Sequence, residues 1–357
     1  MTDSNAGKFP VRWTADFYDP DGAPRYPDLG LSVLDGANHI EISRFNEHRL
    51  IITADQIGDA HGVIVLTPRV TRETLRSPEQ LLALGRFGVG YDTVDVPACT
   101  EADVVLFIAA GALNRSVAEA TVCWMLALSH HVRTKDHLVR TGQWDERTRY
   151  LGFELRDRTL GIVGLGRIGQ AVIQLLRGFG MNPPIAFDPY AKPDAAAVLG
   201  VRLVSLDELV TRADFVSIHC LLNDETLNMI GARQIGLMKK TACLINTARG
   251  GIIDEDALYD ALKTRRIAGA AIDCFVGEPI TRPHRFGELD NILLAPHAIC
   301  WTEEMFRDIG RMCCRSMLDL SLGKVPPGVI NPEVFEKRTF QEKWRRVTEA
   351  LSRPVSP

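Results

Sequence analysis

The sequence predicts an α/β fold made of two doubly wound, mostly parallel sheets. Four short apolar runs, separated by turn or helix-like segments, occupy residues 39–45, 62–68, 81–90 and 103–110. Six further runs alternate with helical patterns between residues 158 and 297, and several of them are apolar throughout. Such alternation is typical of a parallel sheet whose strands are buried on both faces. The two groups of strands therefore predict two domains.

Composition narrows the class of protein. The chain has 357 residues, about two domains on the usual size scale, with 46% hydrophobic and 24% charged residues and a net charge of −4. This balance argues against nucleic acid as the main partner. No apolar stretch reaches the ~20 residues of a membrane span, and the first ten residues lack the apolar centre of a signal peptide. Eight cysteines without a CxxC pair predict reduced thiols in a cytoplasmic protein.

A glycine-rich loop indicates a dinucleotide site. The run LGIVGLGRIG at residues 160–169 places Gly164, Gly166 and Gly169 between a strand and a helix. The first glycine allows a tight turn, the second lets backbone approach a pyrophosphate, and the third lets the helix pack on the strand. The next strand-like run ends at Asp188, roughly 20 residues further on, where a carboxylate can bind a ribose hydroxyl. The alternative is a glycine-rich turn without a ligand. Asp188 would repel a 2′-phosphate, so we expect NAD rather than NADP.

Segments around this core carry further expectations. The pattern over residues 114–140 predicts one long, largely buried helix that begins with a capping box formed by Ser116 and Glu119. An exposed, irregular arm follows at 141–155. Thr302 is expected to cap a helix that returns to the first domain.

The C-terminal segment predicts an amphipathic helix. Phe340, Trp344, Val347 and Leu351 fall on one face of it, with basic residues around them. We expect it to dock on its own chain or on a dimer partner rather than to take part in catalysis.

Three polar residues follow successive strands of the second group. Arg249 comes after LINTA, Glu278 after GAAIDCF, and His297 after NILLAP. Each alone has an ordinary explanation: a solvated charge, a turn residue and a structural histidine. Together they lie at the carboxyl edge of a sheet, where ligands bind in open α/β folds. There a histidine can act as acid and base, the glutamate can stabilise its imidazolium, and the arginine can grip a carboxylate.

Taken together, these segments resemble the D-isomer-specific 2-hydroxyacid dehydrogenase family over most of residues 60–322. The resemblance implies two Rossmann-like domains with the active site in the cleft between them, NAD as cofactor, and hydride transfer between nicotinamide and a 2-hydroxy or 2-oxo acid. It also implies a homodimer with a contact through the 141–155 arm, and no metal. The matching segments are GRFGVGYDTVDV, NRSVAE, TLGIVGLGRIG, HCLLNDETLNMI, LINTARGGIIDEDAL, GAAIDCFVGEP and NILLAPH.

The expected domains are a discontinuous substrate-binding domain (1–120 plus 298–335), a dinucleotide-binding domain (121–297) and a helical tail (336–357). By resemblance, Arg249, Glu278 and His297 are the catalytic residues. The residues implied for cofactor binding are Gly164, Gly166, Arg167, Ile168, Gly169, Asp188, His219, Asn223, Thr247 and Asp273. Those assigned to substrate binding are Val89, Gly90, Asn114, Arg69 and Trp301.

Two departures from the family pattern bear on the substrate. His219 is followed by Cys220 and Leu221 without the usual proline. After His297, Ile299 or Cys300 stands where the family usually has glycine or alanine, and Trp301 would narrow the pocket. Two other functions occur on related folds. A formate-type dehydrogenase lacks a glutamate in the role of Glu278, which argues against that class. A dinucleotide-sensing, corepressor-like binding protein of the same fold remains the alternative.

Overall fold

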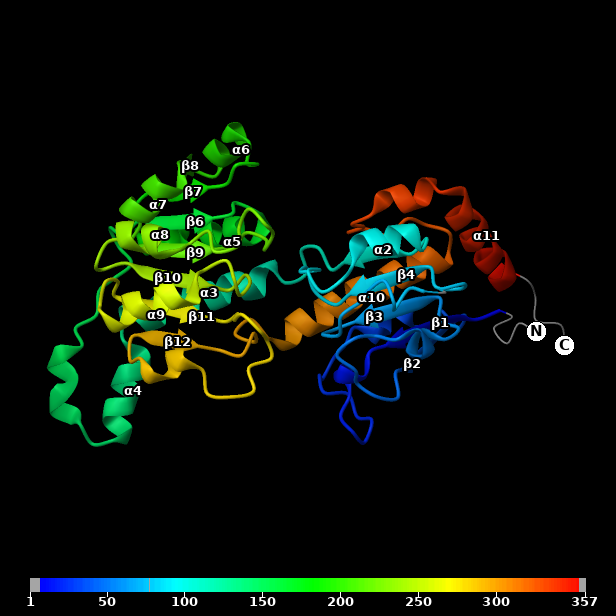
Figure 1. Cartoon of the computed structure of the whole chain (residues 1–357), viewed down its shortest axis with the longest axis horizontal. Helices are drawn as coiled ribbons and strands as arrows, with labels where there is room; N and C mark the ends of the chain where they lie inside the picture. The colour runs from blue at the N-terminus through cyan, green and yellow to red at the C-terminus, as the bar shows by residue number, and fades with distance from the viewer. Residues whose placement is uncertain (1–6, 77, 353–357) are drawn as a thin grey trace. The chain divides into compact units, whose positions relative to one another are not determined.

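The computed structural model describes residues 7–76 and 78–352, and the chain divides into two compact units (Figure 1). One unit combines the residues up to Leu113 with those from Thr302 onward; the other runs from Asn114 to Trp301. The observed divisions therefore lie at 113/114 and 301/302, where we expected 120/121 and 297/298. The C-terminal helix is part of the first unit.

The first unit holds a five-stranded sheet in the order β2-β1-β3-β4-β5, and all of its strand pairs are parallel. The interior strand β1, which lies between β2 and β3, was missed from the sequence because Pro10 and Arg12 interrupt its apolar run. Its residue Val11 pairs with Ile42 on one side and Gly62 on the other. The strands are β1 (Phe9–Trp13), β2 (Ile40–Arg44), β3 (Gly62–Val65), β4 (Ala83–Arg86) and β5 (Val105–Ile108).

Helices cover both faces of this sheet. Ile57 of α1 (Ala54–Ile57) and Ala98 of α2 (Val96–Glu101) pack into one apolar cluster with the strands. On the other face lies α10 (Glu303–Ser321), and Met317 of this helix fills the space that a side chain at Gly62 would need. As predicted, Thr302 caps α10: its hydroxyl accepts a hydrogen bond from the Met305 N–H at 3.1 Å.

The C-terminal helix α11 (Arg338–Ser352) packs against the first unit. Phe340 is fully buried, and its ring lies 5.6 Å from that of Trp344, whose indole N–H donates to the Leu320 carbonyl at 2.7 Å. Lys343 is one of the basic residues that the sequence places around the apolar face of this helix. It is half-buried and donates to the carbonyls of Leu81 and Asp103, and burial lowers its pKa to about 8.

The second unit holds a seven-stranded parallel sheet in the order β12-β11-β10-β9-β6-β7-β8. The strand that precedes the glycine loop, β6, lies inside the sheet between β9 and β7, and the strand order reverses beside it, which is the arrangement of dinucleotide-binding folds. The short strand β8 was not expected. The strands are β6 (Leu160–Val163), β7 (Ile185–Phe187), β8 (Arg202–Leu203), β9 (Phe215–Ile218), β10 (Cys243–Asn246), β11 (Gly269–Ile272) and β12 (Ile292–Leu294).

Two apolar clusters lie on opposite faces of this sheet. One face is covered by helices α3 (Asn114–Ser129), α5 (Arg167–Leu176) and α6 (Pro193–Val198). The other is covered by helices α7 (Leu206–Arg212), α8 (Ala232–Leu237) and α9 (Glu255–Lys263). The inner strands β6, β9, β10 and β11 are buried throughout, which explains why the sequence shows them as nearly continuous apolar runs.

The prediction of one helix over residues 114–140 was wrong. The chain breaks after Ser129, and α4 (Val132–Arg140) starts beyond His131, which has the left-handed φ of 53°. The Phe153 N–H donates a hydrogen bond to the Ser129 carbonyl at 2.9 Å. This bond takes the place of the next hydrogen bond within the helix, and the helix therefore ends here. The capping box was also wrong, because α3 begins at Asn114 and Ser116 lies inside its first turn.

The arm after α4 contains a short 3-10 helix (Trp144–Arg149). Two large apolar side chains of the arm are exposed: Trp144, at the start of this helix, and Leu151, just after it. The other 3-10 segments are Ala15–Phe17, Leu31–Leu34, Arg177–Phe179, Arg285–Glu288 and Pro332–Glu336. Over residues 7–76 and 78–352, no helix combines the length and the apolar character needed to cross a membrane.

Candidate active site

The glycine loop has the shape that a dinucleotide requires. Gly164 has a φ of +93°, and a Cβ there would meet the Cys220 backbone nitrogen at 2.7 Å. A Cβ at Gly169 would meet the Gly164 carbonyl at 2.7 Å, so helix and loop are in direct contact. At Gly166, by contrast, a Cβ would meet no atom within 4 Å. Helix α5 begins directly after this open position. The first N–H groups of a helix have no partner within it, and they carry the positive end of its dipole. Arg167 and Ile168 form the first turn of that helix.

Asp188 joins the end of β7 to the glycine loop. One carboxylate oxygen accepts from the Leu165 N–H at 2.8 Å, and the other accepts from the N–H groups of Tyr190 and Ala191 at 2.9 and 3.1 Å. A hollow of about 230 Å³ lies beside it. Its lining residues are Leu165, Gln170, Asp188, Tyr190, Ala191, Lys192, Ala195, Ala196 and Leu199.

Three further residues assigned to the cofactor, His219, Asn223 and Thr247, lie on loops that follow β9 and β10. Burial lowers the pKa of His219 to about 4, and its ring Nε2 lies 2.8 Å from the Ser217 hydroxyl. The Asn223 side chain accepts from the N–H groups of Glu225 and Thr226 and so shapes its own loop. The hydroxyl of Thr247 lies 3.5 Å from that of Thr121 on α3.

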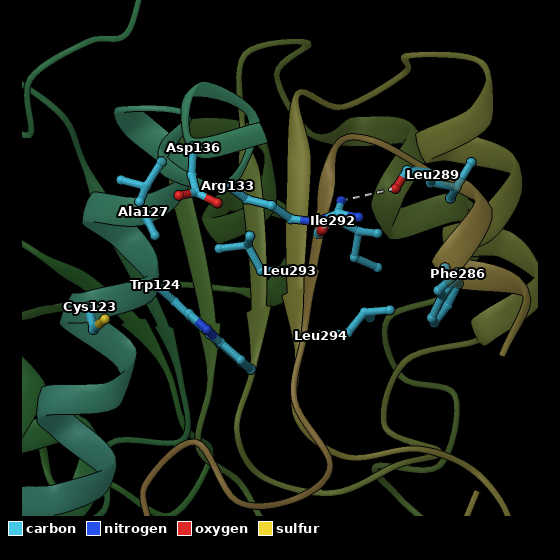
Figure 2. A pocket seen from close by; sticks show the side chains of 12 residues that line it. Cys123, Trp124, Ala127, Arg133, Asp136, Phe286, Leu289, Ile292, Leu293 and Leu294 are labelled. Carbon is cyan, nitrogen blue, oxygen red and sulfur yellow. Dashed lines mark hydrogen bonds between the residues drawn. The ribbon is translucent and has the colours of Figure 1, made fainter. Parts of the chain in front are cut away.

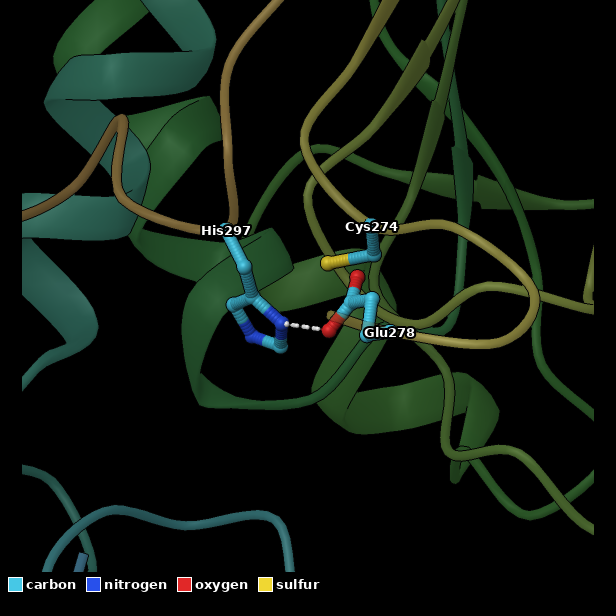
Figure 3. Close-up of side chains that lie close together, drawn as sticks. All are labelled: Cys274, Glu278 and His297. Atoms are coloured by element: carbon cyan, nitrogen blue, oxygen red, sulfur yellow. Dashed lines mark hydrogen bonds and ion pairs between the residues drawn. The ribbon is translucent and has the colours of Figure 1, made fainter. Parts of the chain in front are cut away.

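Arg249, Glu278 and His297 follow β10, β11 and β12, three neighbouring strands of one sheet. Since parallel strands place their carboxyl ends along one edge, the three residues share the edge where the glycine loop also lies. Glu278 and His297 face each other directly: the His297 Nδ1 lies 2.7 Å from a Glu278 carboxylate oxygen (Figure 3).

The surroundings of the pair favour the charged form of the Glu278 carboxylate. Burial alone raises the pKa of Glu278, but the hydrogen bond and charge of His297, the Phe275 N–H at 2.7 Å and the charge of Arg249 outweigh it. The pKa of Glu278 therefore lies below its ordinary value. The Arg249 side chain donates to the Ala248 carbonyl at 2.7 Å.

Asp273, at the end of β11, holds the segment that carries His297. Its carboxylate is 1% exposed and accepts from the N–H groups of Ala298 and Ile299, while its carbonyl accepts from the His297 N–H at 2.8 Å. Burial raises the pKa of Asp273, although these N–H groups act in the opposite direction. His297 has a φ of 53°, a conformation that is uncommon outside glycine, and these hydrogen bonds keep it in place.

Two residues of this region were missed from the sequence. Cys274, whose thiol lies beside the Glu278 carboxylate (Figure 3), is 2% exposed, and burial raises its pKa. Glu255, at the start of α9, accepts from the Val276 N–H at 2.8 Å and lies 3.4 Å from the His284 ring. It thereby anchors the turn that presents Glu278. The only sequence signal for Glu255 is its place among acidic residues at a helix N-terminus.

The residues assigned to substrate binding lie in both units. Val89 and Gly90 follow β4 in the first unit, where Val89 is half-buried, and Arg69 is an exposed residue that follows β3. Asn114 is the first residue of α3 in the second unit. Trp301 follows His297 in the same unit with 48% of its surface exposed.

A larger hollow of about 420 Å³ lies elsewhere in the second unit, between α3, α4 and the edge strand β12 (Figure 2). Apolar side chains such as Trp124, Leu293 and Leu294 line most of it, and Arg133 donates to the Leu289 and Ile292 carbonyls. It contains none of the residues assigned to cofactor or substrate.

Comparison with known proteins defines the class. Residues 122–298 match the model of the D-isomer specific 2-hydroxyacid dehydrogenase family, NAD binding domain. A glyoxylate reductase of Korarchaeum cryptofilum is 34% identical over 87% of this chain and 95% of its own length. The chain therefore belongs to the D-isomer specific 2-hydroxyacid dehydrogenases, a family of NAD-dependent oxidoreductases, as the sequence motifs predicted.

Other relatives agree with this placement. A D-3-phosphoglycerate dehydrogenase of Methanocaldococcus jannaschii is 38% identical over 84% of this chain, but the match spans 57% of the relative's length. The chain thus matches only a little over half of that enzyme. Among solved structures, a glyoxylate reductase from Paecilomyes thermophila matches with a TM-score of 0.77 and 25% identity over 91% of this chain and 99% of its own. These matches confirm the predicted α/β fold with two Rossmann-like domains.

Proposed function

We propose that this protein uses NADH to reduce a small 2-oxoacid to the 2-hydroxyacid, with His297, Glu278 and Arg249 as catalytic residues. The observation that carries the proposal is the 2.7 Å contact between His297 Nδ1 and Glu278 at the edge of the sheet that bears the glycine loop. Nothing in the relatives reported above favours the dinucleotide-sensing alternative.

The glycine loop and Asp188 fit the cofactor. The open space at Gly166 leaves room for a pyrophosphate against backbone N–H groups, and the fixed Asp188 carboxylate suits the hydroxyls of an adenosine ribose. When bound, NADH supplies the hydride. The remaining cofactor contacts are proposed for His219, Asn223, Thr247 and Asp273, with Arg167 and Ile168 in the first turn of α5.

The pair of His297 and Glu278 handles the proton. Reduction of a carbonyl requires a proton on the new alkoxide, and an imidazolium can donate it from Nε2 while Nδ1–H stays bonded to Glu278. A carboxylate with a lowered pKa remains charged at neutral pH and stabilises that imidazolium. In the reverse reaction the neutral ring accepts the proton.

Arg249 is proposed to bind the substrate carboxylate and to polarise the neighbouring carbonyl. Its planar fork of donors matches a carboxylate in a way that an ammonium group does not. Val89, Gly90, Asn114, Trp301 and Arg69 are proposed as the remaining substrate contacts, and Trp301 would limit the size of the acid.

The relatives narrow the substrate class. The Korarchaeum cryptofilum relative matched over 95% of its length is named a glyoxylate reductase, whereas the match to the phosphoglycerate dehydrogenase covers 57% of that enzyme. We therefore propose a short, unbranched 2-oxoacid of the glyoxylate type. A test is reduction of glyoxylate and longer 2-oxoacids with NADH, followed by the nicotinamide absorbance. Turnover that increases with chain length would contradict this proposal.

We further propose a cytoplasmic homodimer. All eight cysteines are free thiols, which supports a reducing compartment. The exposed Trp144 and Leu151 on the arm after α4 support a contact with a second copy. Sedimentation analysis of a Trp144→Ala, Leu151→Ser variant tests this point, and an unchanged dimer would remove the arm from the interface.

A further inference from the structure

Cys274, Glu278 and His297 together form a set of donors that the proposed reaction does not fully use. Each offers one donor atom, and these atoms all lie within 4.8 Å of one another. The Cys274 thiol lies beside the Glu278 carboxylate, which in turn faces the His297 ring (Figure 3). In the proposed reaction, Glu278 and His297 have roles and Cys274 has none.

The donor types favour one class of cation. Sulfur, imidazole nitrogen and carboxylate oxygen are the ligands that Zn²⁺ takes in proteins, and soft thiolates select Zn²⁺ and similar metals over Mg²⁺ and Ca²⁺. In a tetrahedral zinc site, bond lengths near 2.0–2.3 Å place donor atoms roughly 3.3–3.6 Å apart. The three donors thus need side-chain movements of about an ångström to meet that spacing.

We propose that these three residues form an inhibitory site for Zn²⁺ and related soft divalent cations. Inhibition rests on the proposed function, since it requires that Glu278 and His297 act in catalysis. The Cys274 thiol releases its proton to solvent as the metal–sulfur bond forms. The His297 ring binds the metal through Nδ1, and its proton moves to Nε2. A ring bound in this way cannot become the imidazolium that reduction needs.

The burial of the residues supports this order of binding. Glu278 and His297 keep 31% and 42% of their side chains exposed, so a cation from solvent reaches them first. Cys274 is 2% exposed, and its thiol donates weakly to the Ala248 carbonyl at 3.4 Å. It therefore supplies the inner ligand of the site. The fourth position stays open to water or to the carboxylate of a substrate.

Cadmium tests the site without any assay of activity. Binding of Cd²⁺ to a thiolate gives a charge-transfer absorption in the ultraviolet. We expect this band in the full-length protein and in Cys300→Ala, which removes a nearby half-buried thiol outside the site. In Cys274→Ala the band should be absent, or it should require at least about ten-fold more Cd²⁺ to appear. Equal bands in all three proteins would overturn the site.

Zinc inhibition tests whether metal binding at this site blocks the reaction. Zn²⁺, but not Mg²⁺, should inhibit turnover reversibly, and a chelator should restore it. Cys274→Ala should keep turnover and NADH binding while needing about ten-fold more Zn²⁺ for the same inhibition. Equal zinc sensitivity of Cys274→Ala and the unaltered protein would overturn the proposal. If no 2-oxoacid is reduced at all, the proposed function fails, yet the cadmium band still decides the metal site.

Discussion

Replacement of Glu278 by glutamine tests the role of the charged pair. An amide at this position can still accept a hydrogen bond from His297 Nδ1, but it carries no charge. A hydrogen bond to a charged group contributes about 1.5–3 kcal/mol and a neutral one about 0.5–1.5 kcal/mol. Both side chains are about one-third exposed, so solvent weakens their attraction and the lower part of the range applies. We therefore expect the imidazolium to lose about 1 kcal/mol of stabilisation.

The sign and size of the pH effect follow. The pKa of Glu278 is lowered, so its charge is present at neutral pH and is lost only as acid protonates it. Without that charge, the imidazolium releases its proton at lower pH. One pH unit corresponds to about 1.4 kcal/mol, so a loss of about 1 kcal/mol should move the alkaline limb of kcat/KM for reduction down by about 0.7 unit.

The assay is the pH profile of 2-oxoacid reduction at saturating NADH, with NADH affinity measured by fluorescence. Glu288→Gln is a matched control, because Glu288 is an exposed residue of the same unit that bonds to Tyr259 instead. An alkaline limb that stays in place in Glu278→Gln, or that moves upward, would refute the role of the pair.

Three further predictions concern other parts of the chain. Asp188→Ala should narrow the preference for NADH over NADPH, seen as converging kcat/KM values, and an unchanged ratio would remove Asp188 from cofactor selection. Glu255→Ala removes the hydrogen bond to the Val276 N–H, and it should shift the pH profile of reduction in the same direction as Glu278→Gln. The control Asp256→Ala should leave the profile in place. If Glu255→Ala and Asp256→Ala give the same profile, Glu255 has only a structural role. Phe340→Ala should lower the free energy of unfolding by about 3–5 kcal/mol, measured by denaturant titration, and leave kcat unchanged; a loss below 1 kcal/mol would show that α11 is not part of the core.

The second unit was largely predictable because its signals are local. Its buried strands are apolar runs, and the glycine spacing Gly164, Gly166 and Gly169 has few alternative explanations. The residues assigned to catalysis were found for the same reason, as polar residues that directly follow such strands. His297 was predictable as a residue at the sheet edge, although its left-handed backbone has no sequence signal.

Features that depend on distant contacts were not predictable. The end of α3 depends on Phe153, which lies 24 positions beyond Ser129 in the chain and whose N–H donates to the Ser129 carbonyl. No glycine or proline marks the break in the sequence. Lys343 reads as a solvent-facing charge until the carbonyls of Leu81 and Asp103 are placed beside it. Cys274 belongs to the site because Glu278, which follows the same strand β11, and His297, which follows the neighbouring strand β12, both lie next to it.

The most direct test of the proposed reaction compares the unaltered protein with His297→Ala in single-turnover reduction of glyoxylate by bound NADH. We expect rapid loss of the nicotinamide absorbance in the unaltered protein. In the variant we expect a rate about 10²–10⁴-fold lower, with unchanged NADH affinity. Equal rates in the two proteins would contradict the assignment of His297 as the proton donor. Absence of turnover with every short 2-oxoacid, despite bound NADH, would contradict the proposed reaction itself.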